Sequence, residues 1–272
     1  MASLDLQGKV AIVTGGASGI GKSIGWRLLQ EGVNLVIADV DADGGQALRA
    51  KMNSSETDSS AIFVKADVTD RNNVEQLAKG AVAEFGHIDI LVNNAGINIP
   101  RLLVDPAGNE ELTQNIYDGM MAVNVEGAVW CAQAVARHMV ERGEGVIINM
   151  ASECALEGST GQGVYAASKA ALYSFTRSWA KELGSHGIRV VGLAPGIMEA
   201  TALRNEEYDR ALAYTRGISI EEINAAYENA SVPLKRVGKL DEVADVVAFV
   251  ASDMAGYITG TVINVSGGKS RA

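Results

Sequence analysis

The sequence predicts an α/β fold in which a doubly wound, seven-stranded parallel sheet is flanked by helices. Three observations support this prediction. Strand-like and helical patterns alternate from the N-terminus. The strand-like runs are continuously apolar, as expected when helices cover both faces of a sheet. A glycine-rich turn follows the first run and opens the first helical pattern. Right-handed crossovers would place the carboxyl ends of all strands, and any bound ligand, at one edge of the sheet.

Seven apolar runs are the predicted strands. They are residues 9–13, 33–38, 61–64, 88–92, 146–150, 188–194 and 261–265. Amphipathic patterns predict the helices between them. The first follows the glycine turn to residue 31, and the others are residues 44–52, 74–85, 120–140, 165–183 and 241–250. This order gives one Rossmann-like unit, so we expect residues 1–272 to form a single domain.

One segment interrupts the alternation. Residues 197–238 contain no strand pattern, but residues 206–214 and 220–229 have helical character. An insertion of this length after the carboxyl end of a strand is more typical of a lid than of a linker. We therefore expect residues 197–238 to form a helical lid over the substrate.

The composition excludes several classes of partner. The formal net charge is −10, which disfavours nucleic acid and anionic membranes. A small anionic substrate would need a local group of Arg or Lys residues. Cys131 and Cys154 have no metal-site or disulfide spacing, so we expect two reduced thiols and no metal. Residues 1–5 do not resemble a signal peptide and no apolar run would span a bilayer, so a cytoplasmic location is expected.

The turn after the first strand reads Thr-Gly-Gly-Ala-Ser-Gly-Ile-Gly over residues 14–21. Gly15, Gly19 and Gly21 allow a sharp turn and a close approach to the N-terminus of the following helix. Free N–H groups and the helix dipole favour an anion there, such as the pyrophosphate of a dinucleotide. The alternative is a plain tight turn, because the glycine spacing differs from the commoner dinucleotide fingerprint.

Asp39 favours the dinucleotide interpretation. It ends the second predicted strand, where a carboxylate accepts both ribose hydroxyls of adenosine and repels a 2′-phosphate. The alternative role for Asp39 is to cap the next helix. With the glycine turn in place, the sequence predicts NAD rather than NADP as the cofactor.

A second group of residues has catalytic character. Tyr165 and Lys169 are four residues apart in one helical pattern, so they share a face. An ammonium favours the phenolate, and we expect Lys169 to lower the pKa of Tyr165 from about 10. Ser152 follows a strand and is placed to polarise a substrate oxygen. Asn124 falls within a helical pattern, where an amide is locally unfavourable, which indicates a role beyond packing. An incidental helical pair is the alternative for Tyr165 and Lys169.

Taken together, these residues resemble the short-chain dehydrogenase/reductase family over essentially the whole chain. The matching positions are residues 14–21, Asp39, Asp67 and Val68, residues 93–96, Asn124, Ser152, Tyr165, Lys169, Pro195 and Gly196.

The resemblance implies a role for each matching residue. Tyr165 is the expected general acid/base, Lys169 its partner and a ligand of the nicotinamide ribose, and Ser152 the group that polarises the substrate. Asn124 is expected to hold a water linked to Lys169. The remaining NAD-binding residues implied are Gly15, Ser18, Gly19, Ile20, Gly21 and Asp39 at the phosphate and ribose, Asp67 and Val68 at the adenine, Asn94, Ala95 and Gly96 along the ribose, and Pro195, Gly196 and Ile197 near the nicotinamide.

Two further features follow from the family. Many members place Thr four residues after the Pro-Gly pair, whereas Thr201 stands five residues after Gly196. The family usually assembles as homotetramers through its two long central helices, so we expect a homotetramer. A non-enzymatic NAD-sensing protein is the remote alternative, since fold alone does not prove function.

A narrower resemblance concerns the substrate. Residues 100–105, 152–153, 158–159, 195–204, 212–216 and 267–271 are similar to bacterial sorbitol-6-phosphate 2-dehydrogenases. That similarity implies oxidation of D-sorbitol 6-phosphate to D-fructose 6-phosphate. We expect Arg101 and Arg204 to bind the phosphate, and Ser152, Glu153 and Glu157 to bind hydroxyls. Arg210 and Arg216 also lie in the expected lid, where an arginine suits a phosphate. Solvated surface charge is the alternative for each charged residue, and the preferred one for Arg210. A free polyol, a sorbose phosphate and a 3-oxoacyl thioester remain alternative substrates.

Overall fold

The computed structural model describes residues 4–201, 204–228 and 232–270, so residues 1–3 of the N-terminal segment lie outside the described residues. Within them, seven parallel strands form one sheet in the order β3-β2-β1-β4-β5-β6-β7. The strands are β1 (Val10–Thr14), β2 (Asn34–Asp39), β3 (Ala61–Lys65), β4 (Ile90–Asn93), β5 (Gly145–Met150), β6 (Ile188–Pro195) and β7 (Val262–Val265). The predicted α/β fold and its seven strands are confirmed.

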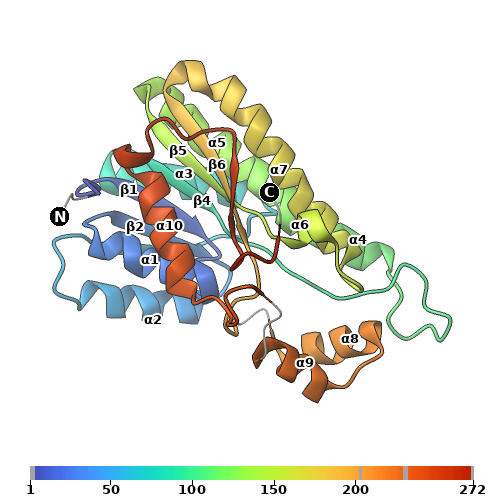
Figure 1. Ribbon diagram of the computed structural model, residues 1–272. Coiled ribbons are helices and arrows are strands. Elements are labelled where there is room, and N and C mark those ends of the chain that lie inside the picture. Colours follow the sequence, from blue (N-terminus) through green and yellow to red (C-terminus); the bar gives the residue numbers. More distant parts are fainter. Residues whose placement is uncertain (1–3, 202–203, 229–231, 271–272) are drawn as a thin grey trace.

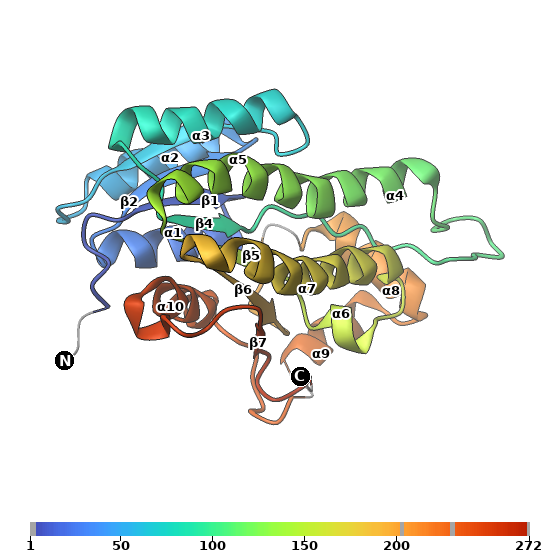
Figure 2. The same cartoon turned by 90° about the horizontal axis from the view of Figure 1, so that it is seen from above.

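Helices cover both faces of this sheet (Figures 1 and 2). One face carries α1 (Gly19–Gln30), α2 (Ala42–Asn53) and α10 (Leu240–Ala251), and the other carries α3 (Arg71–Phe85), α5 (Gly127–Arg142) and α7 (Gly163–Leu183). Successive side chains of β1 alternate between the two layers: Val13 packs in the first core and Ile12 in the second. Both layers are apolar, which explains why the strands lack an alternating polar pattern.

The strand order positions the functional edge. From β1 the chain moves outward to β2 and β3, and then returns to the opposite side of β1 at β4. The carboxyl ends of β1 and β4 therefore mark the point where the winding direction reverses. In open α/β sheets, ligands bind in the crevice beyond this point.

The helix predicted over residues 120–140 is longer and less regular than its pattern indicated. It comprises α4 (Gln114–Met121), a π-helical segment (Ala122–Glu126) and α5. Short α6 (Cys154–Glu157), between β5 and α7, was not predicted. Within the described chain, no helix combines the length and apolar character needed to cross a membrane.

The segment predicted as a lid, residues 197–238, contains two helices. They are α8 (Glu206–Arg216) and α9 (Ile220–Glu228), which agree with the two predicted helical pieces. Figure 1 shows them beyond the carboxyl edge of the sheet, apart from the two helical layers. Residues 202–203 and 229–231 of this segment lie outside the described residues.

Candidate active site

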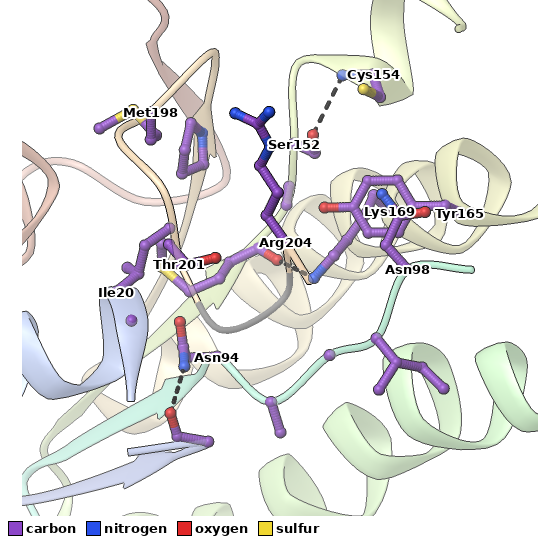
Figure 3. Close-up of a pocket in the computed structure, with 18 of the residues that line it drawn as sticks. Ile20, Asn94, Asn98, Ser152, Cys154, Tyr165, Lys169, Met198, Thr201 and Arg204 are labelled. Atoms are coloured by element: carbon purple, nitrogen blue, oxygen red, sulfur yellow. Dashed lines mark hydrogen bonds between the residues drawn. The ribbon is translucent and has the colours of Figure 1, made fainter. Parts of the chain in front are cut away.

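A cavity of about 790 Å³ opens at the carboxyl edge of the sheet (Figure 3). It extends from the turn after β1, past the ends of β2 and β4, to the segment after β5 and the start of α7. Residues predicted to bind NAD make up much of its wall. They are Gly15, Ser18, Gly19, Ile20, Asp39, Asp67, Val68, Asn94, Ala95, Gly96, Tyr165, Lys169, Pro195, Gly196 and Ile197.

The glycine turn allows neighbouring groups to approach its backbone closely. Gly15 and Gly19 have φ values of +61° and +51°, in the left-handed region that disfavours side chains. Gly21 does not line the cavity, and its assignment as a cofactor-binding residue stays a prediction. It instead packs against Gly15, because a Cβ on Gly21 would lie 2.2 Å from the Gly15 carbonyl oxygen. Gly21 therefore allows the helix to pack closely on the turn.

The N-terminus of α1 is suited to an anion. Ser18 is its N-cap residue, yet its side chain makes no capping hydrogen bond. The first turn of α1 contains no acidic residue that would offset the positive end of the helix dipole. Thr201 lies beside this turn, since a Cβ on Gly19 would be 3.3 Å from the Thr201 Cβ. Thr201 thus lies next to the glycine turn even though one extra residue separates it from Gly196.

Asp39 stands at the end of β2 and lines the cavity. Its Oδ2 accepts a hydrogen bond from the Ala17 N–H at 2.9 Å, and its Oδ1 accepts one from the Asp41 N–H at 3.1 Å. The helix-capping alternative for Asp39 is wrong, because the N-cap of α2 is Asp41, which accepts from Gly44. Asp39 is thus fixed at the cavity wall beside the glycine turn.

Ser152, Tyr165 and Lys169 point into one end of the cavity, and Figure 3 shows Ile20, Asn94 and Thr201 toward the other. Tyr165 and Lys169 occupy adjacent turns of α7, and the Lys169 Nζ lies 5.9 Å from the centre of the Tyr165 ring. Lys169 donates a hydrogen bond of 2.7 Å to the Met150 carbonyl oxygen at the end of β5. Ser152 follows β5 and is buried.

Burial dominates the protonation of this pair. It raises the pKa of Tyr165 to about 12, although the hydrogen bond with Ser152 acts in the lowering direction. Burial also lowers the pKa of Lys169 to about 8. The expectation that Lys169 brings the pKa of Tyr165 below its usual value is therefore wrong here. The ammonium is bonded to a backbone carbonyl and too far from the ring to outweigh desolvation.

Asn124 is buried in the π-helical segment and does not line the cavity. Its Oδ1 accepts from the Ile97 N–H at 2.8 Å, and its Nδ2 donates to the Ile97 carbonyl at 2.9 Å and to the Ser168 hydroxyl at 3.0 Å. A Cβ on Gly96 would lie within 3.3 Å of both the Asn124 amide and the Lys169 Nζ. Asn124 therefore fixes the loop after β4 against α7, close to Lys169.

The residues predicted to bind substrate divide into two groups. Ser152, Glu153, Glu157 and Arg204 line the cavity. Arg101 does not line it, and its assignment as a phosphate ligand stays a prediction. Its guanidinium pairs with the Glu110 carboxylate at 2.7 Å and stabilises the loop that follows β4. Arg210 is exposed and outside the cavity, in agreement with the surface-charge interpretation.

Two cavity residues are already held by other side chains. The buried Glu153 carboxylate is paired with Lys269 and accepts a 2.9 Å hydrogen bond from Ser270. Arg204 pairs with Asp209 at 2.7 Å, and its guanidinium lies 4.0 Å from the centre of the Tyr227 ring. Glu153 thus anchors the C-terminal segment, of which Arg271 lies outside the described residues.

Arg216 of α8, one of the lid arginines named from the sequence, also lines the cavity. The sequence interpretation missed three other side chains of the wall, which are Tyr208 from α8, Tyr227 from α9 and Lys269 from the C-terminal segment. The similarity of residues 267–271 to sugar-phosphate dehydrogenases was the available signal for Lys269. Tyr208 accepts a 3.1 Å hydrogen bond from Gln162, which comes directly before α7. This long-range contact has no local sequence signal.

Among the described residues, no group of three or more His, Cys, Asp or Glu side chains is arranged to hold a metal ion. Both cysteines are free thiols, and burial raises the pKa of each. The site offers hydroxyl, amide, carboxylate and cationic groups around a cavity that reaches from Asp39 to Tyr165.

Comparisons with known proteins agree with this geometry. Residues 9–211 match the family model described as short chain dehydrogenase. The chain is 48% identical over 271 residues to a sorbitol-6-phosphate 2-dehydrogenase of Klebsiella pneumoniae, covering 98% of each chain. It is 35% identical over 269 residues to a 3-oxoacyl-(acyl-carrier-protein) reductase of Thermotoga maritima, covering 97% and 98%. A crystal structure of a 3-ketoacyl-(acyl-carrier-protein) reductase from Brucella melitensis complexed with NADH superposes with a TM-score of 0.83 at 32% identity, covering 98% of this chain and 100% of that one.

Proposed function

Because this chain belongs to the short-chain dehydrogenase family, we propose that it is an NAD-dependent oxidoreductase that interconverts D-sorbitol 6-phosphate and D-fructose 6-phosphate. The observation that carries this proposal is the cavity itself. It joins the Asp39 edge of the sheet to Ser152, Tyr165 and Lys169 without interruption. The 48% identical relative, which carries the name of this activity, supports the choice of substrate.

The residues along the cavity fit NAD. The uncapped N-terminus of α1 and the glycines before it would hold the pyrophosphate. Asp39 would bind the adenosine ribose hydroxyls, with Asp67 and Val68 beside the adenine. Lys169 would bind the nicotinamide ribose. Of the remaining wall residues, Asn94, Ala95 and Gly96 would line the cofactor, and Pro195, Gly196 and Ile197 would lie near the nicotinamide.

The catalytic residues would transfer the proton of the substrate hydroxyl. When bound, NAD supplies the acceptor for a hydride from the carbinol carbon. In oxidation, the Tyr165 oxygen in its phenolate form would take the proton of the substrate hydroxyl. In reduction, Tyr165 donates its proton to the carbonyl oxygen, and its high pKa keeps the phenol form available at neutral pH. Ser152 hydrogen-bonds the substrate oxygen in both directions.

We propose a positioning role for Asn124. Its side-chain donors and acceptor are bonded to Ile97 and Ser168, so it acts on Lys169 through the packing of the loop on α7. We further propose a homotetramer as the working assembly. Sedimentation equilibrium measures that mass directly, and a monomer at micromolar concentration would contradict it.

A 3-oxoacyl thioester is the second candidate substrate, favoured by the Thermotoga relative and the Brucella structure. The test compares NADH oxidation with fructose 6-phosphate, fructose, sorbose 1-phosphate and acetoacetyl-coenzyme A. We expect the highest kcat/KM with fructose 6-phosphate. A preference for the thioester or for free fructose would contradict the substrate, and no turnover with any carbonyl compound would favour a non-enzymatic protein.

A further inference from the structure

Four cationic side chains of the described chain line the cavity, and three already have fixed partners. They are Lys169, Arg204, Arg216 and Lys269. Lys169 is bonded to the Met150 carbonyl beside the reacting groups. Arg204 is neutralised by Asp209, and Lys269 by Glu153. The remaining cation, Arg216, differs from these three in its surroundings.

Arg216 carries a charge that no carboxylate in the described residues neutralises. It lies in the last turn of α8, and its Nη2 donates a 3.0 Å hydrogen bond to the Ser159 hydroxyl. Glu157 lines the same cavity but forms no ion pair with it. One hydroxyl contact leaves most of the five guanidinium N–H donors available to a ligand.

We infer that Arg216 and Ser159 form the subsite that binds the phosphate group of the substrate. A guanidinium presents two parallel N–H groups that match two phosphate oxygens. The Ser159 hydroxyl accepts from Arg216, and its own proton can be donated to a third oxygen. This inference rests on the proposed function, because it specifies which residues distinguish a phosphorylated ketose from a free one.

The subsite lies near the reacting groups but apart from them. Ser159 is in the loop between α6 and α7, and α7 carries Tyr165 in its first turn. Arg216 and Ser152 line the same cavity, and the Ser152 hydroxyl accepts a 3.3 Å hydrogen bond from the N–H of Cys154, which lines it too. One molecule could therefore contact Ser152 with its carbonyl end and Arg216 with its phosphate.

The overall charge of the protein makes a local cation necessary. The net charge of −10 repels a phosphate dianion at long range, and Asp39, Asp67, Glu153, Glu157 and Glu199 add carboxylates to the wall. An unneutralised arginine at the lid end would offset this repulsion only for a ligand that carries its own negative charge. A free hexose would gain little from it.

The experiment replaces Arg216 by Gln and compares two ketoses. Arg216→Gln should raise the KM for fructose 6-phosphate by about tenfold or more, since a charge-assisted bidentate contact is lost. The KM for fructose and both kcat values should change by less than about twofold. Arg210→Gln is the matched control, because Arg210 is in the same helix but outside the cavity. An equal effect on both ketoses would indicate a role in lid packing and would overturn the inference. No effect on either ketose would also overturn it.

A binding measurement separates this inference from the proposed function. Inorganic phosphate is titrated into the wild type and Arg216→Gln by calorimetry in the presence of NADH. Weaker phosphate binding by the variant supports the subsite even if the wild type fails to reduce fructose 6-phosphate, in which case only the proposed substrate is wrong. Equal phosphate affinity of the two proteins would overturn the subsite.

Discussion

The Asp39 carboxylate accepts a 2.9 Å hydrogen bond from the backbone N–H of Ala17, so the end of β2 is joined directly to the glycine turn after β1. This bond holds a negative charge beside the N-terminus of α1, where the dipole attracts phosphates. The same geometry that suits a ribose diol excludes an additional phosphate on it. Cofactor choice should therefore depend on this one side chain.

Replacing Asp39 by Asn should reduce the preference for NAD over NADP by about tenfold or more, because like-charge repulsion of the 2′-phosphate is removed. The measurement is kcat/KM for both cofactors. Asp41→Asn is the control, since Asp41 is a neighbouring carboxylate that caps α2, and Asn caps a helix equally well. A wild type that prefers NADP would contradict the cofactor assignment.

Replacing Tyr165 by Phe should lower kcat by about 10²- to 10⁴-fold, the usual contribution of a general acid/base. The ring would still fill its place on α7, so the affinity for NADH, followed by fluorescence titration, should remain within about threefold. Tyr257→Phe is the control because that side chain is fully exposed. A near-normal rate for Tyr165→Phe would exclude Tyr165 as the proton donor.

Replacing Lys169 by Met should abolish activity and stabilise the protein at neutral pH. The pKa of Lys169 is about 8 when folded and 10.5 in its unperturbed state, so folding disfavours its ammonium. Below pH 8 this penalty is complete and amounts to about 3 kcal/mol. The lost hydrogen bond to Met150 offsets part of the gain, so we expect a stabilisation of about 1–3 kcal/mol at pH 7.

The stabilisation expected for Lys169→Met should depend on pH. As the pH rises from 8 to 10.5, the folded wild type releases the Lys169 proton before the unfolded chain does, and the penalty disappears. The difference between variant and wild type should therefore shrink across this window in urea unfolding experiments. A variant that is less stable than the wild type at pH 7 would contradict the burial effect.

The elements that could be predicted depend on local patterns. Continuous apolar runs located all seven strands, because both faces of the sheet are covered. The glycines at 15 and 19 predicted the turn because their backbone conformation requires that residue type. Helical spacing predicted that Tyr165 and Lys169 share one face of α7, and the resemblance to the family implied their roles.

The missed features depend on contacts between distant segments. Arg101 was assigned to the substrate, but a loop turn brings Glu110 to its guanidinium, and no periodicity predicts that pairing. Glu153 pairs with a lysine 116 residues later. The pKa of Tyr165 was expected to fall, but burial raises it. Several elements bury this side chain together, and the spacing of residues in the sequence does not show that. Local geometry could be predicted from the sequence, whereas the pairing of side chains between loops could not.

Asn124 provides a test of how the π-helical segment supports the site. Its buried amide makes three hydrogen bonds, two with Ile97 and one with Ser168. Asn124→Ala would leave these partners unpaired, so unfolding should require about 2–4 kcal/mol less free energy. The loop after β4 lines the cavity, and its release should also weaken NADH binding.

Urea unfolding and NADH titration measure the two effects of Asn124→Ala separately. Asn72→Ala is the control, because Asn72 is exposed in the first turn of α3 and its side chain makes no hydrogen bond within the described chain. We expect that control to change stability by less than about 0.5 kcal/mol. If Asn124→Ala lost activity with unchanged stability and NADH affinity, the amide would act on the reaction itself. The positioning role derived from its bonds to Ile97 and Ser168 would then be wrong.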